Sequence, residues 1–389
     1  MIEVNGRKYR RPERPAAVIC LDGCDPSYLD PLWRSADMPT LDRWMAQGFS
    51  AIAQAAMPTF TNPNNVSIVT GLPPSAHGIS GNFFLDTETD QEVPMNEARF
   101  VRRPTILAAL VEAGVKVASV TAKKKLSALI APPAPGRSWA VEGASEEAIA
   151  LVGRAAPDVY SADASLFVLD LGAQAIARGL AEVTYLSTTD YVQHKHAPGS
   201  PAAREFYRAI DARLQALEAL GATVVLTADH GMNAKTDAAG APNVRWLGSA
   251  LDTAVGPGAR VILPITDPYV VHHGSLGSAA TVYLYGKDPG RARAALEGLP
   301  GVVEVLDRAA AAQKLELPVD RIGDLFVVAD ADTVLGTWPE RHDLSHVQAG
   351  LRSHGGYAER AVPLISSRAA AMPGPLRNFD AFALALGLA

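Results

Sequence analysis

The sequence is poor in cysteine and in aromatic residues, and it has no long apolar run. Two cysteines, Cys20 and Cys24, occur in 389 residues, and aromatic residues make up 6%. Cys20 stands in the apolar run AAVICL (16–21), so we expect a buried thiol in a reducing compartment rather than a disulfide. That run is too short for a signal-peptide core or a membrane span, which favours a cytoplasmic location.

An excess of positive charge is also missing. The chain has 35 Lys and Arg against 41 Asp and Glu, and its formal net charge is −6. Because a nucleic-acid-binding protein needs a basic face, nucleic acid is not an expected partner. We expect a small-molecule ligand and no membrane partner, and the sequence leaves a homodimer open.

What is present is the composition of a globular protein, with 48% hydrophobic residues. Short apolar runs alternate with longer helical patterns, which predicts an α/β fold with a mostly parallel sheet sandwiched by helices. The expected strands are 16–23, 50–57, 115–122, 181–190 and 222–231, and the expected helices are 38–48, 62–74, 105–114, 170–179 and 200–221.

The alternation of strand and helix patterns is different between residues 258 and 335. Strand-like runs at 259–265, 279–286 and 324–330 surround a helical pattern at 290–301. We therefore predict a smaller inserted α/β cap lobe over 258–335 and a core formed by 1–257 and 336–389. In the core, LRSHGG (351–356) and AVPLISS (361–367) are expected to return to the main sheet.

Polar residues close several of the predicted strands. Asp22, Thr61, Asp190 and the pair Asp229-His230 each follow an apolar run. Since ligands bind beyond the carboxyl ends of the strands in such sheets, these residues predict one convergent pocket.

The types and spacings of these residues suit metal ligands. Asp190 and His194 are four residues apart, on one face of a helix, although Asp190 could simply be a helix N-cap. Asp229 and His230 can both ligate at a strand end, or they can form an ordinary turn. His354, before two glycines, is either a third, remote ligand or a loop histidine. Such an oxygen and nitrogen set without thiolates suits zinc, with manganese or iron as substitutes.

Five motifs carry a resemblance to a known family. LDG, TNPNNVSIVTG, STTDYVQHKHAPGS, TADHGM and SHGG resemble, in order and spacing, the metal motifs of the alkaline phosphatase superfamily. They are most similar to its nucleotide pyrophosphatase/phosphodiesterase-like branch. There, CLDGCDP, TNPNN, SGNFF and TAKKKL resemble the enzymes that hydrolyse phosphonoacetate. The motifs span residues 20–356.

The resemblance implies a dinuclear zinc centre. One zinc ion would be held by Asp22, Thr61, Asp229 and His230, and the other by Asp190, His194 and His354.

The same resemblance implies that Thr61 is the nucleophile. Thr59 is the competing hydroxyl, but Thr61 directly precedes the matching Asn62-Pro63-Asn64 and would lie at a helix N-terminus, which favours phosphoryl oxygens. Asn82 in SGNFF would steady a phosphoryl oxygen, or it is a turn residue.

Three consecutive lysines, 123–125, usually form a solvated surface. The resemblance instead assigns the substrate carboxylate to two lysines in K-x-K spacing, Lys123 and Lys125. Cleavage of a C–P bond next to a carboxylate expels an enediolate, which needs cations already in place. On an extended chain Lys123 and Lys125 would point the same way and Lys124 would point to solvent.

The implied reaction is hydrolysis of phosphonoacetate to acetate and phosphate through a phosphothreonine. One alternative is a nucleotide phosphodiesterase or pyrophosphatase, with Phe83 and Phe84 as stacking surfaces for a base. Another is a non-catalytic metal-binding protein that kept the fold. The sequence does not assign roles to His272, His273, His342 and His346, and we expect His77 to be structural.

Overall fold

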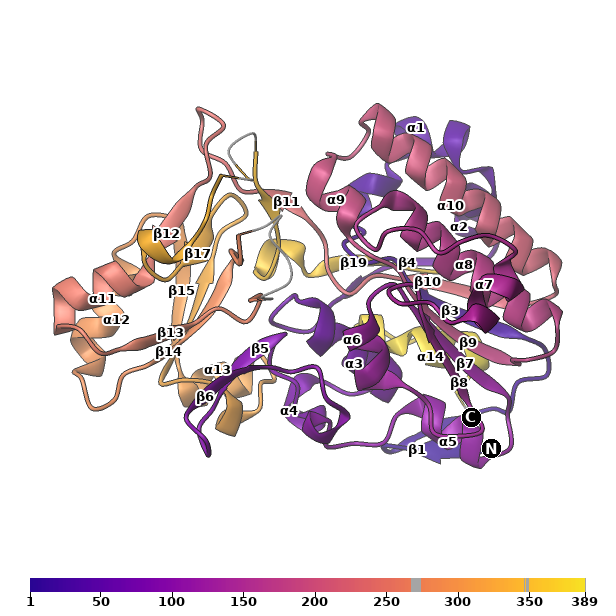
Figure 1. Ribbon diagram of the computed structural model, residues 1–389, viewed down its shortest axis with the longest axis horizontal. Coiled ribbons are helices and arrows are strands. Elements are labelled where there is room, and N and C mark those ends of the chain that lie inside the picture. The colour runs from indigo at the N-terminus through magenta and orange to yellow at the C-terminus, as the bar shows by residue number, and fades with distance from the viewer. Residues whose placement is uncertain (267–273, 346, 348–349, 389) are drawn as a thin grey trace.

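A seven-stranded sheet forms the centre of the larger lobe, in the order β4-β19-β10-β3-β9-β7-β8 (Figure 1). This arrangement comes from a computed structural model that describes residues 1–266, 274–345, 347 and 350–388. The strands are β3 (Ala16–Cys20), β4 (Phe49–Gln54), β7 (Val117–Thr121), β8 (Arg137–Ala140), β9 (Val183–Ser187), β10 (Thr223–Thr227) and β19 (Ala361–Ser366). All neighbours pair in parallel except β19, which is antiparallel to β10 and β4.

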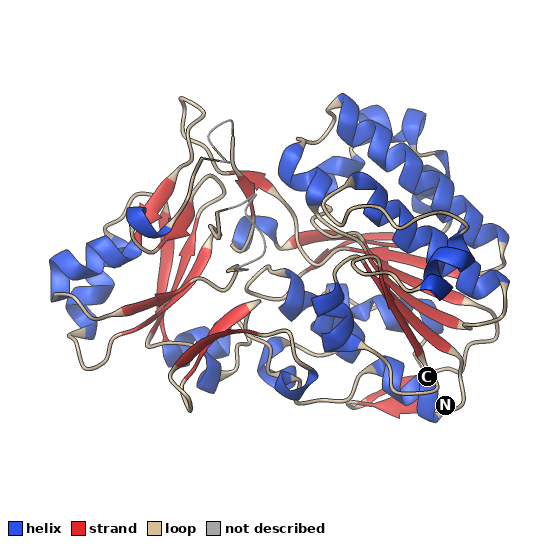
Figure 2. Cartoon of the chain, viewed as in Figure 1, coloured by secondary structure: helices blue, strands red, loops and turns tan. Residues whose placement is uncertain are grey.

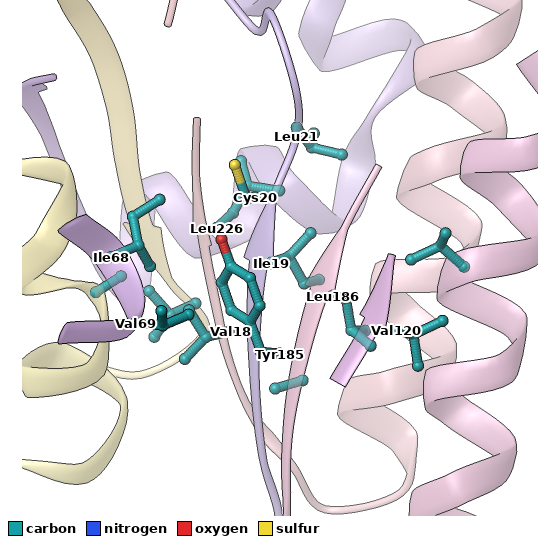
Figure 3. Close-up of a cluster of buried hydrophobic side chains, with 14 of the residues drawn as sticks. Val18, Ile19, Cys20, Leu21, Ile68, Val69, Val120, Tyr185, Leu186 and Leu226 are labelled. Atoms are coloured by element: carbon teal, nitrogen blue, oxygen red, sulfur yellow. The ribbon is translucent and has the colours of Figure 1, made fainter. Parts of the chain in front are cut away.

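The central strands are buried on both faces. Every residue of β3, β7, β9 and β10 is buried, as expected for continuous apolar runs in a parallel sheet covered by helices. Figure 3 shows Val18 and Tyr185, register partners on β3 and β9, on the same side of the sheet as Ile68 and Val69 of a covering helix. The predicted mostly parallel sheet is confirmed.

Helices cover both faces of this sheet (Figures 1 and 2). On one face α8 (Ala162–Ala177) contacts β7 and β9 and α10 (Pro201–Ala219) packs against α8. On the other face α14 (Ala381–Leu386) contacts β3, β10 and α3 (Thr61–Thr70).

Local sequence explains where several helices begin and end. α2 (Pro39–Gln47) has proline in its first turn and ends before Gly48, as predicted. α10 begins after Ser200, whose side chain accepts the Ala203 N–H. α8 begins after Ser161, well before the expected residue 170. The helix expected within 62–74 was predicted to be closed by Gly71, and it does end at Thr70, where Gly71 adopts a left-handed conformation with φ 69°.

The smaller lobe has a four-stranded antiparallel sheet and its own apolar core. Its elements are β13 (Arg260–Ile262), β14 (Ala279–Tyr283), β16 (Leu325–Ala329), β15 (Val302–Asp307), α12 (Pro289–Glu297) and α13 (Arg308–Lys314). Leu247 and Leu251 of α11 (Leu247–Val255) join the same core, although they precede the predicted boundary at 258. The limits 258–335 stay a prediction.

One segment differs from its prediction. Residues 351–356 do not return to the main sheet, because β18 (Arg352–Ser353) pairs instead with β11 (Asn233–Ala234). The remaining elements are β1 (Ile2–Val4), β2 (Arg7–Tyr9), β5 (Phe83–Asp86), β6 (Gln91–Pro94), β12 (Val244–Trp246), β17 (Val334–Gly336), α1 (Pro31–Asp37), α4 (Pro74–His77), α5 (Ile106–Glu112), α6 (Lys124–Ile130), α7 (Glu146–Val152) and α9 (Tyr191–Lys195). Among the described residues, no helix has the length and apolar character needed to cross a bilayer.

Candidate metal centre

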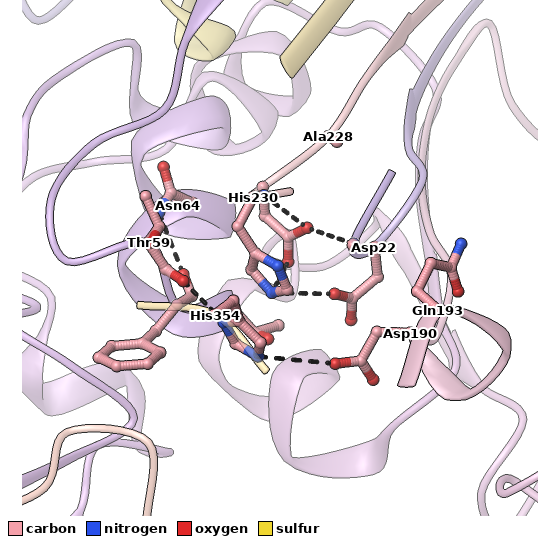
Figure 4. Close-up of polar contacts among 12 residues, drawn as sticks. Asp22, Thr59, Asn64, Asp190, Gln193, Ala228, His230 and His354 are labelled. Carbon is pink, nitrogen blue, oxygen red and sulfur yellow. Dashed lines mark hydrogen bonds and ion pairs between the residues drawn. The ribbon is translucent and has the colours of Figure 1, made fainter. Parts of the chain in front are cut away.

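Acidic and imidazole side chains converge beyond the carboxyl ends of three neighbouring strands (Figure 4). Asp22 follows β3, Asp190 follows β9, and Asp229 and His230 follow β10. His354, directly after β18, reaches the same place from the other end of the chain. The cluster is therefore at the sheet edge where ligands of such folds bind.

Two sets of potential metal ligands lie side by side. One set is Asp190, His194 and His354, and the other is Asp22, Asp190 and His230. Within each set the ligand atoms lie within 4.8 Å of one another, and all the residues are buried. Asp190 belongs to both sets, so its carboxylate lies between two potential ion positions.

The distances show how closely these groups are packed. His194 Nε2 lies 2.9 Å from Asp190 Oδ2, and His354 Nε2 lies 3.9 Å from the same oxygen. His230 Nε2 lies 3.3 Å from Asp22 Oδ1 and 3.7 Å from Asp229 Oδ2. The His230 and His354 rings stack, with centroids 3.5 Å apart.

All three histidines use the same ring nitrogen, Nδ1, for a contact with a backbone carbonyl. In each, Nδ1 is 2.7–2.9 Å from a backbone carbonyl oxygen, and this leaves Nε2 toward the carboxylates. The carbonyls belong to Arg352 for His194, to Gly231 for His230 and to Thr59 for His354. A neutral imidazole that donates from Nδ1 presents a lone pair at Nε2, which is the usual state of a metal-ligating histidine.

The electrostatics show an excess of negative charge. Burial, together with the carboxylates of Asp190 and Asp229, raises the pKa of Asp22 well above its usual range. Burial lowers the pKa of His230, but the carboxylates of Asp229, Asp22 and Asp190 outweigh it and raise this pKa to about 10. Burial, with His230 close by, lowers the pKa of His354 well below its usual range.

Two buried atoms in this cluster lack hydrogen bonds. Within the described part of the chain, Asp22 Oδ1 and His230 Nε2 make no hydrogen bond, although they face each other at 3.3 Å as an ion pair. A buried polar atom without a partner is costly. The crowded carboxylates and the aimed Nε2 atoms fit a site for divalent cations, which would satisfy these atoms and offset the negative charge.

The alternative role of Asp190 does not match its contacts. Asp190 occupies the N-cap position of α9, but its side chain makes no capping hydrogen bond. Its oxygens lie instead against His194 and Lys123. Asp229 Oδ1 accepts the N–H groups of Gly23 and His230, so this carboxylate stabilises the backbone after both β3 and β10.

Thr61 and Thr59 lie in different surroundings. Thr61 is the first residue of α3 and is 9% exposed. One amide joins it to the cluster: Asn65 Nδ2 donates to Thr61 O at 3.0 Å and to Asp229 Oδ2 at 3.3 Å. The Thr59 hydroxyl is fully buried, accepts the Gly355 N–H and donates to Gly356 O. The Thr59 hydroxyl therefore stabilises the loop that carries His354.

Asn82 lies beside the first turn of α3. Its Oδ1 accepts the Asn62 N–H at 2.9 Å, so the amide is held next to Thr61 by the residue that follows it.

The lysines reach the site by a different route from the one predicted. The extended K-x-K geometry is wrong, because β7 ends at Thr121 and α6 begins at Lys124. Lys123 Nζ nevertheless lies 3.6 Å from Asp190 Oδ1, and its side chain is 15% exposed. Lys125 is half-buried, and burial beside Lys123 lowers its pKa to about 7. Lys124 is exposed, as expected.

Of the other histidines, two have structural contacts. His77 is fully buried and bonds Ser67 and the Ile79 N–H. His342 bonds Thr337 through Nε2 and the Gly274 carbonyl through Nδ1. His272, His273 and His346 lie outside the described residues.

The sequence reasoning missed Arg352 and Asn65. The Arg352 guanidinium donates to the carbonyls of Gln193 and Met232 and thereby joins β18 to α9. Nothing in the residues around Arg352 signals this role, since its partners are backbone groups far away in the chain. Asn65 was inside a motif that the sequence singled out, but its partners were not foreseeable.

Comparison with known proteins agrees with this geometry. A family model described as type I phosphodiesterase / nucleotide pyrophosphatase matches residues 16–355. The chain is 46% identical to phosphonoacetate hydrolase from Sinorhizobium meliloti 1021, in crystal structures with phosphonoacetate and with phosphonoformate. Each match covers 99% of this chain and 98% of the other, with a TM-score of 0.94.

A more distant likeness concerns the fold alone. Human ectonucleotide pyrophosphatase / phosphodiesterase 5 is 18% identical, with 95% of this chain and 93% of the other covered and a TM-score of 0.66. The sheet topology, the family model and the 46% identity agree with one another. The chain belongs to the type I phosphodiesterase / nucleotide pyrophosphatase family of the alkaline phosphatase superfamily.

Proposed function

We propose that this protein is a dinuclear zinc hydrolase that cleaves the carbon–phosphorus bond of phosphonoacetate, releasing acetate and phosphate. The observation that carries the proposal is the shared carboxylate of Asp190. It lies between two buried ligand sets and also contacts Lys123, a cation suited to the carboxylate of the substrate. The 46% identity to phosphonoacetate hydrolase from Sinorhizobium meliloti supports the choice of substrate.

The proposed ligands are those that the family resemblance implies: Asp22, Thr61, Asp229 and His230 would hold one zinc ion, and Asp190, His194 and His354 would hold the other. The two buried sets, Asp190 with His194 and His354 and Asp22 with Asp190 and His230, support this assignment. Bound zinc supplies Lewis acidity toward a hydroxyl and toward phosphoryl oxygens. Manganese or iron would be accepted by the same oxygen and nitrogen donors.

Thr61 is the proposed nucleophile. Its hydroxyl gives its proton to water, Oγ1 bonds to phosphorus, and the C–P bond breaks with its electron pair passing to the acetate carbon. Water then attacks phosphorus of the phosphothreonine, and the P–O bond breaks to return the Thr61 hydroxyl and release phosphate. The position of Thr61 at the start of α3 favours the phosphoryl oxygens, because helix N-termini attract anions.

Asn82 and the two lysines have distinct proposed roles. Asn82 Oδ1 is held by the Asn62 N–H, so its Nδ2 is the end that donates to a phosphoryl oxygen. Lys123 and Lys125 bind the carboxylate of the substrate and stabilise the enediolate that leaves, which water then protonates.

The expected nucleotide alternative has less support from the aromatic side chains. Phe84 is buried and packs edge-on against Phe100, and Phe83 packs against the small cluster of Leu85, Ile262 and Tyr283. Phe84 is therefore not an open stacking surface for a base, whereas Phe83 is half-buried. The limits of the cap lobe, a cytoplasmic location and a homodimer stay predictions.

Phosphate release from phosphonoacetate and from an aryl phosphate ester, and nucleoside monophosphate release from a nucleotide diester, all with added zinc, test the proposal. The Lys123→Ala/Lys125→Ala variant should lose phosphonoacetate hydrolysis but keep most activity on the aryl ester, whose good leaving group needs no cation. The exposed Lys124→Ala is the matched control and should behave as wild type. Equal loss on both substrates, or faster release from the nucleotide diester, would contradict the assignment.

A further inference from the structure

An ion pair with no solvent exposure lies next to the metal ligands but outside the ligand sets. Lys235 Nζ and Glu359 Oε1 are 2.8 Å apart, and both side chains are 0% exposed. Charged side chains are rarely buried so completely, because desolvation of two ions costs more than an ordinary contact returns. Stability alone is therefore a poor explanation for this pair.

Glu359 joins two segments that carry metal ligands. Its Oε2 accepts the Gly356 N–H at 2.9 Å, two residues after His354. Its Oε1 accepts from Asn233 Nδ2 at 2.7 Å, and its own carbonyl oxygen accepts the Gly231 N–H, next to His230, at 2.8 Å. One residue thus holds the backbone beside each of two proposed ligands.

The two ligands joined in this way belong to different ion positions. His230 is in the set with Asp22, and His354 is in the set with His194. Their rings stack with an interplanar angle of 8°, so a small displacement of either segment would change both positions together.

Lys235 extends the connection to the smaller lobe. Besides Glu359, its Nζ donates to Ala331 O at 2.8 Å, in the turn between β16 and β17. The same lobe also touches the His354 segment through the Ser278 N–H, which donates to His354 O at 2.9 Å. The pair therefore lies where the smaller lobe, the His230 segment and the His354 segment meet.

We propose that the buried Lys235–Glu359 ion pair is a positioning pair for two metal ligands. It fixes the distance between His230 and His354, and hence between the two zinc ions that they would bind. It also holds the smaller lobe in contact with the segments that carry these two histidines. The inference rests on the dinuclear centre of the proposed function. It assigns neither residue a contact with substrate. Partners that orient metal ligands typically change metal affinity by about 10–100-fold when they are altered.

Zinc binding by chelator-treated, full-length protein tests this role without reference to turnover. Glu359→Gln keeps the size of the side chain, but its amide has one acceptor oxygen where the carboxylate has two. Either the Gly356 N–H or the donors of Asn233 and Lys235 therefore lose their acceptor. We expect at least one of the two zinc dissociation constants to rise about tenfold or more. The visible spectrum of the cobalt-substituted variant should also differ from that of wild type.

Asp37→Asn is the matched control. Asp37 is another buried carboxylate with two cationic partners, Arg204 and Arg208 at 2.6 Å each, but it lies at the end of α1 and touches none of the proposed ligands. It should lower the melting temperature while both zinc affinities and the cobalt spectrum stay as in wild type. If Glu359→Gln does not fold, Asn233→Ala removes one donor to Glu359 from a half-buried position and should weaken zinc binding by a smaller factor.

The outcomes separate this inference from the proposed function. Wild-type protein that binds two zinc ions, together with a folded Glu359→Gln or Asn233→Ala that binds both within twofold of wild type, would overturn the positioning role alone. Wild-type protein that binds no zinc would overturn the dinuclear centre and this inference with it. Weakened binding in the Glu359 or Asn233 variant, but not in Asp37→Asn, supports the inference.

Discussion

At the residue scale, the carboxamide of Asn65 connects the proposed nucleophile to a proposed ligand. Its Nδ2 donates to Thr61 O and to Asp229 Oδ2, while its Oδ1 accepts from Tyr185 OH at 2.7 Å and from Ser187 Oγ at 2.9 Å. All four hydrogen bonds are buried, so the amide cannot rotate without leaving a polar group without a partner.

Asn65→Ala should therefore weaken both zinc binding and catalysis. We expect a fall in kcat and in zinc affinity of about 10–100-fold, and a loss of about 1–3 kcal/mol in the free energy of unfolding. Tyr185→Phe removes only one donor to Asn65 and is the milder control. Chelator competition, steady-state kinetics and denaturant unfolding measure the three quantities. Unchanged kcat and zinc affinity in Asn65→Ala would contradict this role.

The two neighbouring hydroxyls should respond differently to substitution. Thr61→Ala should reduce phosphate release from phosphonoacetate by about 10³-fold or more, and Thr61→Ser should keep a measurable share. Thr59→Val removes a buried hydroxyl bonded to Gly355 and Gly356, so it should cost about 1–3 kcal/mol of stability and still turn over. An active Thr61→Ala beside a folded, inactive Thr59→Val would identify Thr59 as the nucleophile.

At the scale of elements, α3 and α4 are locked together by a buried histidine. His77, at the end of α4, accepts the Ile79 N–H at Nδ1, so its Nε2 carries the proton and donates to Ser67 Oγ of α3. Burial lowers the pKa of His77 to about 3. The corner between the two helices therefore depends on a neutral imidazole.

This histidine should make stability depend on pH. In the unfolded chain its pKa is near 6.5, so its contribution is fully present above that pH and is lost as the pH falls from about 6.5 toward 3. The slope is about 1.4 kcal/mol per pH unit over that window. His77→Gln cannot take up a proton, so its unfolding free energy should fall less steeply between pH 6 and pH 4. Parallel denaturant-unfolding slopes for the two proteins would exclude this effect.

At the scale of the whole molecule, the two lobes meet at the ligand loops. His354 O accepts the Ser278 N–H, and the Phe60 ring packs edge-on against His354. Cations held by the proposed metal centre would therefore also order the loop that contacts the smaller lobe.

Removal of metal should lower the stability of the entire protein. Without cations, the carboxylates of Asp22, Asp190 and Asp229 repel one another in a buried cluster. Zinc at 1,000 times its dissociation constant should add about 4.1 kcal/mol per site to the free energy of unfolding. Calorimetry of chelator-treated protein with and without added zinc measures the shift. Equal melting temperatures would argue that the cluster binds no cation.

The sequence by itself determined the elements and the positions of the site residues along the chain. Strands such as β3 and β10 are continuous apolar runs, and a run of this kind can only be satisfied by burial on both faces. The residues Asp22, Asp190 and Asp229 were identifiable because each interrupts the polarity pattern at the end of such a run, and parallel strands bring those ends to one edge.

Only the tertiary structure decided how other groups reach that edge. Lys123 comes within 3.6 Å of Asp190 although the chain turns into α6 there, and β18 leaves the main sheet to pair with β11. The Lys235–Glu359 pair spans 124 positions in the chain. Hydropathy periodicity reports which side of an element is buried, but it carries no information on which distant polar group will meet it. Pairing of this kind is decided when the whole chain packs.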